Sequence, residues 1–154
     1  MVTKGWKTQP IRDFTAQVCK ARVPDEADET QSKKGDIVGT AFAVSRKPPL
    51  LVTCRHVVEA ATESDTCQLN DTVEICFPLA MDSGETITAT VTALDEAHND
   101  DVVILELQTD DELLPSKAEI AILGDARKSI DYEPQHHFKS YGFPEIPDII
   151  GNSA

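Results

Sequence analysis

The chain has 154 residues, of which 40% are hydrophobic and 27% are charged, a composition typical of a soluble globular protein of one domain or slightly more. No apolar run approaches the ~20 residues that a membrane-spanning helix needs, so we expect no membrane segment. Fourteen basic residues against 27 acidic ones give a net charge of -13, which repels phosphate groups and argues against nucleic acid as a partner.

Short runs of apolar and β-branched residues, separated by polar turns, predict an all-β sandwich or barrel. Six strands are expected, over residues 14–23, 37–45, 50–53, 72–77, 86–94 and 102–107. Pro24 follows the first strand, and the acidic residues 25–30 after it are predicted to form a solvated loop. Residues 56–61 can form one or two helical turns.

A charge-rich break follows the sixth strand and suggests two units. We expect a first β-barrel over residues 10–108, a linker over 109–118, and the start of a second, truncated β-barrel over 119–154. Only residues 119–123 and 137–143 of that second unit resemble strands. Because these strands lack partners, we expect the second unit to be poorly ordered, to pack on the first barrel, or to pair with another copy.

The first ten residues include basic side chains but no apolar stretch behind them, which predicts no secretory signal and a cytoplasmic location. The four cysteines, Cys19, Cys54, Cys67 and Cys76, form no C-x-x-C pair, and three of them lie in apolar, strand-like runs. We therefore expect reduced, buried thiols. In an extracellular setting, a disulfide from Cys67 to Cys54 or Cys76 is the alternative.

Two residues are candidates for acid–base chemistry. His56 follows the strand 50–53 at the lip of the predicted barrel, where an imidazole is exposed enough to titrate and held firmly enough to point in one direction. Asp101 opens the apolar strand 102–107, and a carboxylate fixed there can orient an imidazole. A structural histidine and an ordinary turn residue are the alternatives on position alone. Asp100 competes with Asp101, but neighbours in a strand point to opposite faces and Asp101 adjoins the apolar run.

Four segments resemble, in order, the trypsin-like (chymotrypsin-fold) serine proteases. They are Gly39 to Val44 (GTAFAV), Val52 to Val58 (VTCRHVV), Asp101 to Leu105 (DVVIL) and Ser140 to Pro144 (SYGFP). The resemblance covers about residues 10–145 and implies a six-stranded Greek-key barrel followed by a second barrel. It also implies a serine endopeptidase that hydrolyses peptide bonds of a protein or peptide substrate through an acyl-enzyme, with His56 as the general base and Asp101 orienting it.

The nucleophile of this family lies in a G-[DN]-S-G motif of the second barrel. Of eight serines in the chain, only Ser153 has a similar setting, but it comes nine residues after Pro144 and Ala154 stands where the motif needs glycine. We therefore predict that the chain is an N-terminal portion of a longer protease, inactive by itself, and part of a larger regulated assembly. The alternative is a catalytically inactive protease-like domain that acts as a protein-binding or regulatory module.

A metal site is suggested by one feature, the adjacent His136 and His137. Adjacent residues rarely ligate one ion together, and no carboxylate or cysteine lies nearby at ligand spacing. The sequence therefore predicts no metal and no cofactor.

Overall fold

The computed structural model describes residues 13–82, 84–97 and 100–122. The elements of this part are β1 (Thr15–Cys19), β2 (Val23–Asp25), β3 (Asp28–Lys33), β4 (Ile37–Ser45), β5 (Leu50–Thr53), α1 (Arg55–Thr62), β6 (Thr72–Cys76), β7 (Ile87–Leu94) and β8 (Val103–Leu107). No helix in these ranges is long and apolar enough to cross a membrane.

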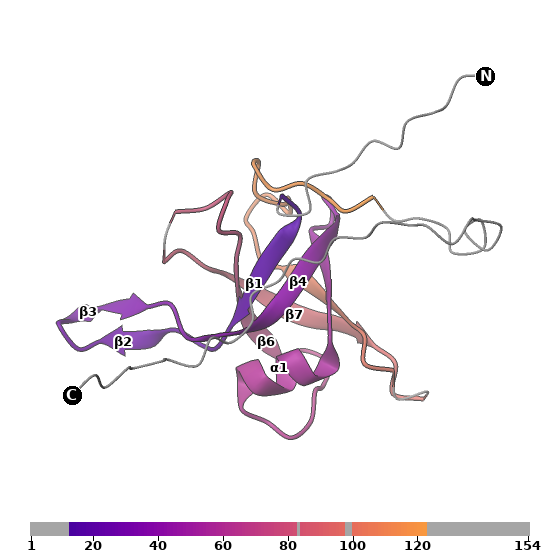
Figure 1. Cartoon of the computed structure of the whole chain (residues 1–154), viewed down its shortest axis with the longest axis horizontal. Coiled ribbons are helices and arrows are strands. Elements are labelled where there is room, and N and C mark those ends of the chain that lie inside the picture. The colour runs from indigo at the N-terminus through magenta and orange to yellow at the C-terminus, as the bar shows by residue number, and fades with distance from the viewer. Residues whose placement is uncertain (1–12, 83, 98–99, 123–154) are drawn as a thin grey trace, which may run out of the picture.

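Six of the strands form a closed antiparallel barrel in the order β1-β4-β5-β8-β7-β6, with β6 pairing back onto β1 (Figure 1). Strand β5 pairs with β8 and not with β6, so the chain crosses one end of the barrel between β5 and β6. Helix α1 lies in that crossover, at the foot of the strands in Figure 1. The prediction of an all-β, six-stranded barrel is confirmed.

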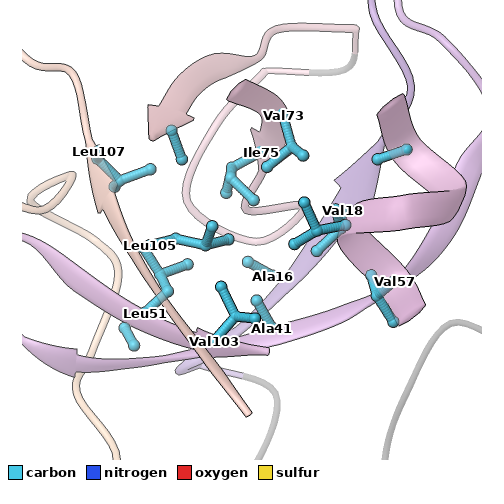
Figure 2. Packing of buried hydrophobic residues seen from close by; sticks show 14 of the residues in the cluster. Ala16, Val18, Ala41, Leu51, Val57, Val73, Ile75, Val103, Leu105 and Leu107 are labelled. Carbon is cyan, nitrogen blue, oxygen red and sulfur yellow. The ribbon is translucent and has the colours of Figure 1, made fainter. Parts of the chain in front are cut away.

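The barrel interior is filled by alternate residues of each strand. In β8 the side chains of Val103, Leu105 and Leu107 are buried while those between them are partly exposed, which is the period of two that a strand imposes. Figure 2 shows these side chains meeting those of Leu51 and Ile75 from other strands. Burial of each such side chain contributes roughly 1.5–3 kcal/mol relative to exposure.

The predicted strands agree with the barrel strands except at the first one. Residues 37–45 and 50–53 are β4 and β5 in full, and the expected helical turns are α1. The strand expected over residues 14–23 instead ends at Cys19, after a bulge between Val18 and Cys19. Beyond the bulge the Lys20 N–H donates to the Asp36 carbonyl, 2.9 Å away, and the register of β1 with β4 ends at the pair Cys19 and Ile37.

The loop predicted over residues 25–30 is wrong, because β2 and β3 form an antiparallel hairpin that projects away from the barrel (Figure 1). Arg22 holds its base: the guanidinium donates to the Ser32 hydroxyl and carbonyl, and also to the Gly84 carbonyl at 2.8 Å and the Thr86 hydroxyl at 3.2 Å. Strand β3 (DETQSK) contains no apolar residue and therefore shows no hydrophobic period, so the sequence pattern could not reveal the hairpin.

Residues 109–122 pass back along the barrel. Leu114 and Ala118 are buried in the core cluster, and the Leu114 N–H donates to the Arg46 carbonyl at 3.1 Å. The strand expected from Glu119 is not formed over residues 119–122, where the backbone bonds to two different segments and makes no ladder: Glu119 N–H to the Asp13 carbonyl at 3.0 Å, and Ala121 N–H to the Ala43 carbonyl at 2.7 Å. Residues 123–154 lie outside the described ranges.

Candidate active site

His56 lies in the first turn of α1, directly after β5. Cys54 is the N-cap residue with extended backbone angles (φ -95°, ψ 150°), and its carbonyl accepts from the Val57 N–H at 3.1 Å. Just before it, the buried Thr53 hydroxyl donates to the Thr40 carbonyl of β4 at 2.9 Å. The turn that carries His56 is therefore attached to two barrel strands.

A glycine on β4 allows α1 to pack close to the barrel. A Cβ at Gly39 would lie 2.6 Å from Cγ1 and 2.7 Å from Cγ2 of Val57, which is closer than real Cβ contacts. Val57 is buried at this position and directly follows His56. Gly39 thus fixes how closely the first turn of α1 approaches β4, and with it the position of His56. The sequence motif containing Gly39 was recognised, but this contact between distant segments was not.

The strand register brings Asp101 to the same place. Thr53 of β5 pairs with Val103 of β8, and continuing this antiparallel register sets residue 101 beside the start of α1. The Arg55 guanidinium donates to the Asp95 carbonyl at 2.8 Å, which ties the β7–β8 connection to α1. His56 and Asp101 are therefore both positioned by the pairing of β5 with β8.

The Asp101 carboxylate makes two hydrogen bonds to His56. One oxygen accepts from the His56 backbone N–H at 3.1 Å, and the other lies 2.5 Å from Nδ1 of the ring. Because a carboxylate only accepts, Nδ1 carries a proton in this arrangement. The His56 backbone N–H is the main cause that lowers the pKa of Asp101, so the carboxylate is ionised at neutral pH.

Both side chains remain open to solvent: 68% of the His56 side chain and 52% of the Asp101 side chain are exposed. The ring is thus held on its Nδ1 side by Asp101 while the pair stays accessible at the surface. An oriented imidazole of this kind can take a proton from a hydroxyl group placed at Nε2.

A comparison of the sequence with models of protein families identifies the family of this chain. A family model described as trypsin-like peptidase domain matches residues 39–140, about two thirds of the chain. The chain belongs to the trypsin-like peptidase domain family. The matched range contains both His56 and Asp101 and ends before Ser153. No curated protein matches the sequence.

Of the other candidates of this trypsin-like peptidase domain, Asp100 is the one that lies within the described ranges. Asp100 is exposed, and it is Asp101 that contacts His56. Ser153, His136 and His137 lie outside the described residues.

The four cysteines are free thiols in the structure, so the disulfide considered for Cys67 is not formed. Three are buried as predicted, whereas Cys54 is only half-buried and its neighbourhood includes Asp101. Burial raises the pKa of the Cys54 thiol, and the negative charge of Asp101 adds to this effect. Cys54 was predicted only as a reduced, buried thiol, and no signal in its own segment indicated that it lies beside the pair.

Proposed function

We propose that this chain supplies the general base of a serine endopeptidase, with His56 as the base and Asp101 as the residue that orients it. The proposal depends on one observation: in a member of the trypsin-like peptidase domain family, the Asp101 carboxylate holds both the backbone N–H and Nδ1 of His56. The substrate is a protein or peptide chain.

The geometry gives each group a role in acyl transfer. With its proton on Nδ1, neutral His56 carries its lone pair on Nε2 and can accept the proton of a serine hydroxyl as that oxygen attacks the substrate carbonyl. The imidazolium that results is stabilised by the Asp101 carboxylate. His56 then returns the proton to the leaving amine, which releases the first product and leaves an acyl-enzyme that water hydrolyses.

The nucleophile comes from outside the described residues. Within the described ranges, the His56 ring and the His56 backbone N–H each form a hydrogen bond with Asp101. No hydrogen bond there joins the ring to a serine hydroxyl. We propose that a serine of the second barrel approaches the exposed Nε2 side of the ring, together with the backbone N–H groups that stabilise the oxyanion.

A fluorophosphonate probe, which reacts with an activated serine, tests this function. The natural gene product that contains this sequence and the 154-residue chain are both treated with the probe and analysed by intact mass. We expect one adduct on the natural product, lost in His56→Ala. Asp101→Asn should slow labelling by up to about 10⁴-fold, the cost of the same substitution in the Ser-His-Asp template.

The matched control is Asp100→Asn, which removes the same charge from the neighbouring residue. The Asp100 side chain is exposed, and it is Asp101 that contacts His56. Its labelling rate should equal that of the unchanged protein. An adduct on the 154-residue chain, mapped to Ser153, would place the nucleophile inside this sequence. No adduct on either protein would contradict the enzyme and favour a binding module of the same fold.

A further inference from the structure

Three different metal-binding side chains meet at the end of the barrel. One donor atom each of Cys54, His56 and Asp101 can be chosen so that all three lie within 4.8 Å of one another. The donors are a sulfur, an imidazole nitrogen and a carboxylate oxygen, which is the mixture that zinc accepts in proteins. The family resemblance pairs His56 with Asp101, but no sequence pattern places Cys54 with them.

The distances are close to those of a tetrahedral zinc site. Bond lengths of about 2.3 Å to sulfur and about 2.0 Å to nitrogen or oxygen place the ligand atoms of such a site about 3.5 Å apart. The donors lie at most 4.8 Å apart, whereas Nδ1 of His56 is only 2.5 Å from an Asp101 oxygen, so the wider pairs must approach, and this pair must separate by about 1 Å if both of its atoms bind the ion. His56 and Asp101 are the members that can move, since both side chains are more than half exposed.

The backbone already fixes where the three side chains start. Cys54 is the N-cap of α1, yet its side chain makes no capping hydrogen bond, so the sulfur is not engaged with the helix. His56 stands two residues later in the first turn, and Asp101 is placed by the pairing of β8 with β5. The net charge of -13 also favours the approach of a cation over that of an anion.

We propose that Cys54, His56 and Asp101 form a binding site for a zinc-type divalent cation, with water completing the coordination. Binding requires the Cys54 thiolate, so one thiol proton is released to solvent. If Nδ1 is the nitrogen ligand, its proton moves to Nε2 and the metal replaces the His56–Asp101 hydrogen bond. If Nε2 is the ligand, the proton stays on Nδ1 and the metal occupies the lone pair of the base atom. In both cases His56 can no longer accept a proton.

The regulatory part of this inference, reversible inhibition by zinc, rests on the proposed function, whereas metal binding itself does not. Binding is therefore tested first, on the untagged 154-residue chain titrated with Co²⁺ and monitored by absorption. We expect a thiolate-to-cobalt charge-transfer band that saturates at one equivalent and disappears when Zn²⁺ is added.

Variants locate the ion. Cys54→Ser, which keeps a good N-cap residue, should abolish the band. Asp101→Asn should weaken Co²⁺ binding at least ~10-fold, because changes even to residues that only support a ligand cost 10–100-fold. The matched control Asp100→Asn should change the affinity less than ~3-fold. Thermal unfolding of each variant verifies that it is folded.

Two results would overturn the metal site: no charge-transfer band in the unchanged chain, or a band that survives Cys54→Ser. Inhibition is then measured on the natural gene product as the ratio of fluorophosphonate labelling rates without and with Zn²⁺. We expect a ratio well above one that Cys54→Ser brings close to one. A ratio of one in a protein that binds zinc would reject the regulation and leave the proposed function intact.

Discussion

Two exposed parts of the molecule, the His56–Asp101 pair and the β2–β3 hairpin, are held in different ways. His56 is directly followed by the buried Val57 and Val58, and Asp101 lies two residues before the fully buried Val103. In the hairpin, by contrast, Val23 is 51% exposed and the attachment is made through polar contacts of Arg22. A side chain that is open to solvent can therefore still have a fixed orientation when the residues next to it are buried in the core.

The largest loss of stability should come from emptying that core. Leu105 of β8 is fully buried beneath the barrel wall, so Leu105→Ala should lower the free energy of unfolding by about 2–5 kcal/mol. Glu106→Ala, on the opposite face of the same strand, serves as the control and should cost under ~1 kcal/mol. Chemical denaturation measures both. Equal losses of unfolding free energy in the two variants would show that the buried face of β8, the strand that follows Asp101, does not stabilise the barrel more than its outer face.

The buried thiol of Cys19 tests the packing beside the β1–β6 pair without a large change in side-chain volume. Burial is the main cause that raises the pKa of Cys19 from 9.0 to about 11. At pH 8 the folded protein should therefore hold about 100-fold less thiolate at this site than an ordinary cysteine does, and alkylation followed by peptide mass spectrometry should find Cys19 protected.

The same shift gives a pH dependence of stability. Because the folded-state pKa lies above the unfolded-state value, the protonated thiol contributes its full stabilisation below pH 9, and this contribution is lost as the pH rises from 9 towards 11. Cys19→Ala should remove this part of the alkaline destabilisation. Rapid alkylation of Cys19 in the folded chain would contradict its burial beside the β1–β6 pair.

A substitution where β4 closely approaches α1 should lower the free energy of unfolding less than Leu105→Ala does, and the loss should depend on one neighbouring side chain. Gly39→Ala places a methyl group against the Val57 side chain, and overpacking of this kind costs about 1–3 kcal/mol. Val57→Ala makes room for it, so the double variant should lose less stability than the sum of the two single changes. Additive losses in a double-mutant cycle would mean that Gly39 does not set the position of α1.

The smallest global effect is expected at the hairpin. Arg22→Ala removes exposed hydrogen bonds to Ser32, Gly84 and Thr86, and substitutions at the surface usually change stability by only about 0.5 kcal/mol. Hydrogen exchange should instead accelerate locally in residues 23–33 while β5 and β8 stay protected. Lys47→Ala, an exposed substitution in the β4–β5 turn, is the control. Loss of protection throughout the barrel would show that the hairpin is part of the core fold.

The barrel could be predicted because its strands bury one face, and burial of one face leaves a period of two in the sequence. Strands β4 and β5 were found for this reason, whereas the β2–β3 hairpin, which shows no such period, was not. The preference for Asp101 over Asp100 followed from its place at the start of an apolar strand.

Contacts between segments far apart in the chain could not be predicted in the same way. The clash that a Cβ on Gly39 would make with Val57 is a property of packing, and no local pattern encodes it. The position of Cys54 beside Asp101 depends on the pairing of β5 with β8, so the thiol was interpreted from its own segment alone. Both features became visible only when the register was known.

The most direct test of the account is the protonation of the His56 ring, observed by nitrogen-15 NMR of the 154-residue chain near neutral pH. We expect a proton on Nδ1, giving a low-field proton signal that disappears in Asp101→Asn and persists in Asp100→Asn. A ring whose only proton is on Nε2, or an Nδ1 signal that Asp101→Asn leaves unchanged, would contradict the assignment of His56 as the oriented general base.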